Sequence, residues 1–139
     1  MGLLETPGRS RNPLCDVSID MVVRYAVGDA DERPWGRWEI LAVGEGYACK
    51  RITVKPGGKL SLQLHHHRDE HWTIVEGNAL VTCGEEQKSV DPNTHVFIPK
   101  QTAHRIENPG NVDVVFIEVQ QGDQLDEEDI VRLEDVYGR

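Results

Sequence analysis

The sequence contains little cysteine and no long hydrophobic run. Its three cysteines, Cys15, Cys49 and Cys83, are far apart and form no CxxC pair, which argues against a structural zinc knot or a disulfide framework and predicts reduced thiols. No window approaches the roughly 20 apolar residues of a membrane span, and the N-terminus lacks the continuous apolar stretch of a signal peptide. We therefore expect a soluble protein of the cytoplasm.

The sequence also lacks an excess of positive charge. Its 15 lysine and arginine residues stand against 24 acidic residues, giving a net charge of −9 and no basic patch suited to a polyphosphate backbone. Nucleic acid is therefore a poor candidate partner. A chain of 139 residues is long enough for one domain with its own core. We predict an N-terminal arm over residues 1–30 and a single domain over 31–139, with the arm packed across the partner of a homodimer.

Short runs rich in β-branched and aromatic residues recur along the chain, with glycine, proline and asparagine turns between them. Such spacing is typical of an antiparallel barrel or sandwich, so the predicted class is all-β. The tail is the exception: Asp126 can cap a helix, and Leu125 can contact Ile130, which predicts a short C-terminal helix ending near Val136. The predicted strands cover residues 39–43, 48–54, 60–67, 72–75, 79–82, 95–98 and 112–120.

Four residues of metal-ligand type fall in and after one predicted strand-turn-strand unit. Gln63 and His65 alternate along a strand and so share a face, Glu70 follows after four intervening residues, and His104 is a downstream candidate. Imidazole, carboxylate and amide donors together suit a divalent transition metal. The sequence therefore predicts a mononuclear metal site.

His65 is followed by two further histidines, His66 and His67, and strand alternation places them on different faces. Alternation turns His66 away from the face of His65, so it is not a predicted ligand. His67 returns to that face, where it could ligate the metal or line the pocket as an acid or base, and we favour the second role. His71 follows Glu70 directly and is expected to face away from it.

These spacings resemble the two motifs of the cupin superfamily. The first motif is matched from Gly57 to Gly77, with Gln63 in place of its first histidine. The second is matched by Pro99, His104 five residues on, and Asn108 four further. Its two glycine positions hold Asn93 and Gln101 instead; asparagine tolerates a left-handed turn, whereas Gln101 is the stronger departure.

A denser resemblance is to the type II phosphomannose isomerase family, whose cupin domain normally ends a bifunctional enzyme that also carries mannose-1-phosphate guanylyltransferase. It covers roughly residues 31 to 139. The matching segments are Arg33-Pro34-Trp35-Gly36, Lys50-Arg51-Ile52-Thr53-Val54, Ser61-Leu62-Gln63, His65-His66-His67-Arg68, Glu70-His71-Trp72, His104-Arg105, Glu107-Asn108-Pro109-Gly110, Asp129-Ile130-Val131-Arg132-Leu133-Glu134-Asp135 and Tyr137-Gly138-Arg139.

The resemblance implies a double-stranded β-helix, a cupin or jelly-roll barrel. It also implies interconversion of mannose 6-phosphate and fructose 6-phosphate, which supplies mannose for GDP-mannose and polysaccharide synthesis. The implied metal, for which we predict zinc, is held by Gln63, His65, Glu70 and His104. Because 139 residues leave no room for a nucleotidyltransferase domain, we expect any guanylyltransferase to be a separate partner.

Aldose-ketose exchange requires a base, stabilisation of an enediolate oxygen and a cationic cradle for the phosphate. Arg68 is our first candidate for the phosphate, with Arg51, Lys55, Lys100 and Arg105 as further possible contributors. The candidate bases are His67 and Glu118; the latter shares one face of a predicted strand with Val114, Phe116 and Gln120, and a carboxylate on such an apolar face is unusual.

Two alternatives remain open at this point. The chain could be a non-catalytic cupin module that binds a metal and a sugar phosphate, or a regulatory partner of a guanylyltransferase. It could also be another cupin enzyme such as a dioxygenase, because the same fold supports many reactions. The amide ligand Gln63 counts against the dioxygenase, since oxygen-activating sites rely on histidines or a facial triad.

Overall fold

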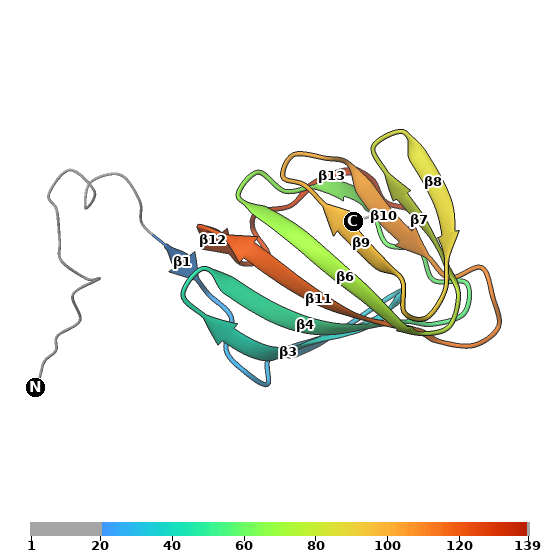
Figure 1. Ribbon diagram of the computed structural model, residues 1–139, viewed down its shortest axis with the longest axis horizontal. Helices are drawn as coiled ribbons and strands as arrows, with labels where there is room; N and C mark the ends of the chain where they lie inside the picture. Colours follow the sequence, from blue (N-terminus) through green and yellow to red (C-terminus); the bar gives the residue numbers. More distant parts are fainter. Residues whose placement is uncertain (1–20, 139) are drawn as a thin grey trace, which may run out of the picture.

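The computed structural model describes residues 21–138, in which every regular element is a β-strand, so the predicted all-β class is confirmed. Two sheets face each other (Figure 1). The six-stranded sheet has the order β2 (Ala30–Arg33), β3 (Gly36–Gly44), β4 (Tyr47–Val54), β11 (Val114–Gly122), β6 (Arg68–Glu76) and β9 (His95–Ile98). The five-stranded sheet has the order β13 (Val131–Glu134), β5 (Leu62–Leu64), β10 (His104–Glu107), β7 (Ala79–Cys83) and β8 (Glu86–Val90).

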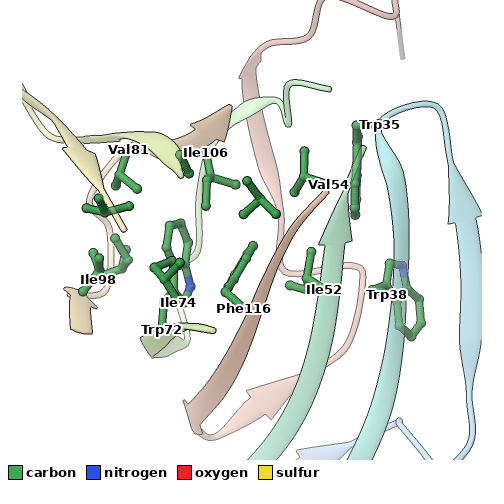
Figure 2. Close-up of a cluster of buried hydrophobic side chains, with 14 of the residues drawn as sticks. Trp35, Trp38, Ile52, Val54, Trp72, Ile74, Val81, Ile98, Ile106 and Phe116 are labelled. Atoms are coloured by element: carbon green, nitrogen blue, oxygen red, sulfur yellow. The ribbon is translucent and has the colours of Figure 1, made fainter. Parts of the chain in front are cut away.

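The inner face of the six-stranded sheet is apolar at one end and polar at the other. Strand alternation buries every second residue, and at the apolar end Ile74, Phe116, Ile52 and Trp38 pair directly from β6 across β11 and β4 to β3 (Figure 2). Further along the same strands the buried residues become charged or polar. These are Lys50 on β4, Glu118 and Gln120 on β11, and Arg68 and Glu70 on β6.

This division positions the site. The apolar end, with the other core residues of both sheets, supplies the hydrophobic burial that stabilises the fold. The polar end contributes less hydrophobic burial, and its charged groups require partners there because a buried unpaired charge is costly. Some of these partners lie in the same sheet, as Arg68 and Glu70 do, and others come from the five-stranded sheet and from the segment that follows β11.

The predicted C-terminal helix is wrong. Asp126 does act as a cap, since its Oδ1 accepts hydrogen bonds from the backbone N–H of Glu128 at 3.0 Å and of Asp129 at 3.2 Å, but only one turn forms. The chain then extends into β13, which pairs with the edge of β5. Backbone pairing with β5 and the burial of Asp129 override the local helix signal, which is a weak preference by comparison.

The first 20 residues of the predicted arm lie outside the described residues. The rest of it packs on its own chain: β1 (Val22–Val23) pairs in parallel with β12 (Gln124–Leu125), and the buried ring of Tyr25 meets Trp38 edge-on at 5.9 Å. The predicted boundary between the arm and the domain, after residue 30, falls at the first residue of β2. Within the part of the chain that is described, no helix has the length and apolarity of a membrane span.

Candidate metal centre

Three buried residues from both sheets meet at the polar end of the fold. His65 directly follows β5, Glu70 lies on β6 and His104 begins β10. The distance from His65 Nε2 to Glu70 Oε2 is 3.0 Å, and from His104 Nε2 to Glu70 Oε1 it is 3.8 Å. All three ligand atoms lie within 4.8 Å of one another, so this cluster is able to hold a metal ion.

The two imidazoles are oriented by backbone carbonyl groups. His65 Nδ1 lies 2.6 Å from the carbonyl oxygen of Asp129, and His104 Nδ1 lies 2.9 Å from that of Thr102. A carbonyl oxygen only accepts, so Nδ1 donates in both cases, and in the neutral ring the lone pair is then on Nε2. Burial lowers the pKa of His104, which favours this neutral form. Both Nε2 atoms point into the cluster as metal ligands do.

Glu70 is ionised and bonded on both oxygens. Oε2 accepts from Nε of Arg68 at 2.9 Å, and Oε1 accepts from Nε1 of Trp72 at 2.9 Å. Burial alone would raise the pKa of Glu70, but the guanidinium of Arg68 beside it holds that pKa well below its usual value. Glu70 is 2% exposed, so its charge acts in a medium where screening by water is weak.

The geometry fits a divalent transition ion. Ligand bonds of about 2.0–2.2 Å place neighbouring donor atoms on one metal roughly 3 to 4 Å apart, the range of the contacts of Glu70 with both histidines. A neutral His65 also brings a lone pair to 3.0 Å from a carboxylate oxygen, an arrangement that a cation between them would stabilise. Gln63 stands directly opposite His104 across β5 and β10, so its amide is the fourth candidate ligand.

A cavity of about 60 Å³ opens beside this cluster. Both sheets contribute to its wall. The lining residues that carry polar side chains are Arg33, Trp35, Trp38, Lys50, Gln63, Arg68, Glu70, Trp72, His104, Arg105, Glu118, Glu127 and Arg132.

The histidine triplet divides differently from the prediction. β5 ends at Leu64, so alternation stops before His65, and the next two residues turn outward. His66 is exposed, as expected. The side chain of His67 is 47% exposed, contacts Asp123 and is not part of the cavity wall, so it is not brought to the site. His71 faces away from the cluster and stacks on His95 with 5.6 Å between ring centroids.

Glu118 lies on the cavity wall with 4% exposure. Its Oε2 accepts a hydrogen bond of 2.6 Å from Nε2 of Gln120, and Lys50 is its direct neighbour across β11 and β4. Burial, followed by the negative charge of Glu70, raises the pKa of Glu118 to about 7. A carboxyl group that ionises near neutral pH is suited to accept and return a proton.

The predicted cationic residues separate into two groups. Arg51, Lys55 and Lys100 are exposed and do not line the cavity. Arg68 and Arg105 are buried and do line it. Each guanidinium nitrogen of Arg68 already has one contact: besides the bond from Nε to Glu70, Nη1 donates to the carbonyl of Asp126 at 3.1 Å, and Nη2 lies 3.3 Å from Nε2 of His65.

Lys50 and Asp129 are among the residues of the site that the sequence analysis missed. Lys50 lies in the buried series Ala48, Lys50, Ile52 and Val54 of β4, so the alternation that identified Glu118 could also have found it. Its Nζ donates to Glu127 Oε2 at 2.8 Å and helps to lower the pKa of that carboxyl, which burial opposes, to about 2. Asp129, which orients His65, could not be found from the local sequence because its contacts with residues 65–67 are more than 60 residues distant in sequence.

The two substituted glycine positions of the second cupin motif keep a left-handed backbone. Asn93 has φ of 76° and Gln101 has φ of 61°, and among the residues described here no other non-glycine residue has positive φ. The backbone N–H of Gln101 donates to the carbonyl of His65 at 2.7 Å. The loop before His104 therefore keeps its shape despite the departure from glycine.

Comparison with known proteins agrees with this geometry. Residues 24–135 match the family described as mannose-6-phosphate isomerase C-terminal. The xanthan biosynthesis protein XanB of Xanthomonas campestris pv. campestris is 52% identical over 107 residues, which are 77% of this chain and 23% of XanB. The mannose-1-phosphate guanylyltransferase ManC of Salmonella typhimurium is 50% identical over 107 residues, 77% of this chain and 22% of ManC. The chain thus spans less than a quarter of the length of either relative.

Among solved structures, the cupin domain of Schizosaccharomyces pombe Cnp3 is similar with a TM-score of 0.60 at 17% identity, covering 63% of this chain and 64% of that one. This likeness confirms the predicted double-stranded β-helix. The family match covers most of the chain and includes all four candidate ligands. The chain therefore belongs to the mannose-6-phosphate isomerase C-terminal family.

Proposed function

We propose that this chain is a metal-dependent mannose-6-phosphate isomerase that interconverts mannose 6-phosphate and fructose 6-phosphate through an enediolate. The observation that carries the proposal is the position of Glu118. It lies on the wall of the same cavity as Glu70 and His104, and its pKa of about 7 suits proton transfer near neutral pH. Family membership supports the same reaction class.

Gln63, His65, Glu70 and His104 would hold the metal, for which we propose zinc. A divalent metal bound there supplies a Lewis acid that polarises the sugar carbonyl. Lys50 and Glu127 also lie on the cavity wall. They form an ion pair with each other, so together they add little net charge to the site.

Glu118 is the proposed base. As a carboxylate it takes the proton from C2 of the open-chain aldose, and the electron pair of that C–H bond forms the C1–C2 double bond of the enediolate. The proton on Glu118 exchanges with solvent, and Glu118 then returns a proton to C1. The proton of the C2 hydroxyl passes to the oxygen on C1, which gives the ketose. No oxidant or reductant is consumed. Gln120, whose amide donates to Oε2 of Glu118, holds the carboxylate in place for both transfers.

Arg68 is the proposed stabiliser of the enediolate oxygen. Its Nη2 contacts Nε2 of His65, and that contact would be lost if this nitrogen held a metal, which would leave a donor of Arg68 beside the ligand cluster. His67 has no part in the proposal because its side chain lies outside the cavity. Of the two candidate bases, His67 and Glu118, the proposal therefore keeps only Glu118.

The wider role follows from the relatives. XanB is named for xanthan biosynthesis and ManC for mannose-1-phosphate guanylyltransferase, so we propose that the isomerase supplies mannose for GDP-mannose and polysaccharide synthesis beside a guanylyltransferase. A homodimer and a cytoplasmic location remain predictions of the sequence.

The test is an assay of purified protein with mannose 6-phosphate in D₂O, in which nuclear magnetic resonance follows both fructose 6-phosphate and deuterium at C2. We expect turnover with a divalent metal, loss of turnover with a chelator, and deuterium in recovered mannose 6-phosphate. Glu118→Gln should lower kcat by about 10²–10⁴-fold. Glu76→Gln, an exposed position on β6, is the matched control and should leave kcat unchanged.

Absence of turnover with any divalent metal would overturn the isomerase and favour the non-catalytic binding module. Turnover without deuterium incorporation would argue against the enediolate. Full activity of Glu118→Gln would exclude Glu118 as the base. Oxygen uptake during the reaction would favour the dioxygenase.

A further inference from the structure

Lys50 has two carboxylates beside it on the cavity wall and forms an ion pair with only one of them. Lys50 of β4 stands directly opposite Glu118 of β11, and both side chains are buried on the inner face of the sheet. The Cβ atoms of such a pair are about 4.5–5.5 Å apart, a distance that a lysine side chain spans. Nζ of Lys50 nevertheless lies 2.8 Å from Oε2 of Glu127, and within residues 21–138 Glu118 takes part in no ion pair.

Two aromatic rings surround the ammonium group of Lys50 at this position. Nζ lies 4.4 Å from the ring centroid of Trp38 and 4.9 Å from that of Tyr25. An aromatic face attracts a cation within about 6 Å, and the attraction is stronger where water is excluded. Because Lys50 is buried, both rings stabilise its ammonium group where it contacts Glu127.

Glu127 is itself held in place as the partner of Lys50. The hydroxyl of Tyr25 donates to Oε2 of Glu127 at 2.5 Å, and Nη2 of Arg33 lies 3.6 Å from Oε1. Burial acts to raise the pKa of Glu127, but Lys50 lowers it to about 2, so this carboxylate is ionised near neutral pH. The segment before β2 and the segment after β12 therefore meet at the ammonium group of Lys50.

The other ionisable groups around Glu118 do not take the place of Lys50. Arg68 on β6 is already bonded to Glu70 at 2.9 Å, and Glu70 is negatively charged. Burial lowers the pKa of His104, which favours its neutral ring. Lys50 is therefore the cation best placed to pair with Glu118. The ionisable groups that surround Glu118 from neighbouring elements are Tyr25, Lys50, Arg68, Glu70, His104 and Glu127.

We propose that Glu127 and Tyr25 are positioning residues that hold the Lys50 ammonium group away from Glu118 and so leave the Glu118 carboxylate unpaired for proton transfer. The inference rests on the proposed function for the role of Glu118 as the base. A carboxylate bound in an ion pair is a weaker base, because the opposite charge stabilises its ionised form. The pKa of about 7 for Glu118 agrees with this arrangement, since burial and the charge of Glu70 outweigh the effect of Lys50.

The test removes the charge of Glu127 and follows the ionisation of Glu118. In Glu127→Gln the ammonium group of Lys50 is released to pair with Glu118, and an opposite charge beside a carboxyl group lowers its pKa by about 1–3 units. We expect the acidic limb of the pH profile of kcat/KM to move to lower pH by that amount, and kcat at pH 8 to fall by about tenfold. Tyr25→Phe removes only the hydroxyl that bonds Glu127, so it should move the limb in the same direction by less.

Two further variants separate this effect from a general disturbance of the fold. Glu127→Gln combined with Lys50→Met removes the ammonium group as well, so the acidic limb should return toward its wild-type position. Glu39→Gln is the matched control, because Glu39 forms an ion pair with Arg51 of the same strand β4 on the outer face of the sheet, and it should leave the limb in place. A limb that does not move in Glu127→Gln, or that does not return in the double variant, would overturn the proposal.

The carboxyl resonance of Glu118 tests the same arrangement without turnover. It is followed by nuclear magnetic resonance in metal-free protein labelled with ¹³C-glutamate and is assigned by its absence in Glu118→Gln. A Glu118 pKa that falls in Glu127→Gln, in a protein without turnover, would support the positioning role and overturn the isomerase, whereas turnover with an unchanged Glu118 titration would do the reverse. Thermal unfolding shows whether each variant is folded; if Glu127→Gln is not, Tyr25→Phe decides the question.

Discussion

Asp129 accepts a hydrogen bond from His65 through its backbone carbonyl, with 2.6 Å between the carbonyl oxygen and Nδ1. The carboxylate of the same residue accepts the backbone N–H groups of His66 and His67, both at 3.0 Å. One buried residue of the segment after β12 therefore fixes both the ring of a candidate ligand and the turn that carries it. The metal site depends on this segment although none of its residues is a proposed ligand.

We predict that Asp129→Ala weakens metal binding by about 10–100-fold, the usual effect of removing a group that orients a ligand. The variant loses both carboxylate bonds to the turn, so the carbonyl that holds His65 is no longer fixed. Competition with a chelator of known affinity measures the change. Asp123→Ala is the control, because Asp123 is exposed and its carboxylate contacts the outward ring of His67. Equal affinities in the two variants would mean that His65 is positioned without Asp129.

We predict that Glu70→Gln and His104→Ala each lose the metal on dialysis, whereas His66→Ala retains it. Glu70 and His104 contribute ligand atoms to the three-residue cluster, while His66 is exposed and takes part only through its backbone. Metal content per chain after dialysis, by elemental analysis, is the measurement. The ligand assignment fails if His66→Ala loses as much metal as the other two.

Glu118 gives a pH dependence of stability with a definite sign. Its pKa is 4.5 in ordinary surroundings and about 7 in the fold, so between these values the unfolded chain has lost a proton that the folded chain retains. Its contribution to stability is fully present below pH 4.5 and is lost as the pH rises through about 7. Relative to the wild type, metal-free Glu118→Gln should therefore gain up to about 3 kcal/mol in free energy of unfolding from pH 4.5 to pH 8.

Urea denaturation at a series of pH values measures this difference. The reference is Glu76→Gln, whose exposed side chain should change the pH profile little. A constant difference between wild type and Glu118→Gln across the range would show that Glu118 is not perturbed in the folded protein.

Alternation along strands was the sequence rule that worked best. It predicted that Val114, Phe116, Glu118 and Gln120 share a face, and all four are buried on β11. The rule depends only on the geometry of an extended chain, so it holds wherever the strand continues. It failed for His67 because β5 ends at Leu64, and the end of that strand is set by Asp129, far away in the sequence.

Two other strands, β10 and β13, could not be predicted from the local sequence for the same reason. β10 has the sequence His-Arg-Ile-Glu, which carries little strand preference of its own, yet β5 and β7 pair with it from both sides. β13 was predicted as part of a helix, yet β5 offers it an unpaired edge. Strand identity at these positions comes from neighbours in space, which a single sequence does not reveal.

The backbone at Gln101 supports a last prediction, on stability. Its φ of 61° costs a non-glycine residue about 1–2 kcal/mol, and glycine, which avoids that cost, gives back about 0.5–1 kcal/mol in chain entropy. Gln101→Gly should therefore stabilise the fold by about 0.5–1 kcal/mol and raise the melting temperature by about 2–4 °C. Little is lost with the side chain, because it is exposed, and the hydrogen bond to His65 comes from the backbone.

Gln121→Gly is the matched control for this prediction. Gln121 is also exposed but lies in the extended backbone of β11, paired with Tyr47 and Asp69, where glycine has no strain to relieve and lowers stability by about 0.5–1 kcal/mol. Asn93→Gly should raise the melting temperature less than Gln101→Gly, because asparagine adopts the left-handed region more readily. Differential scanning calorimetry ranks the three variants. If Gln101→Gly melts as low as Gln121→Gly, the left-handed backbone before His104 carries no strain, and the substitution of glutamine for the motif's glycine is neutral.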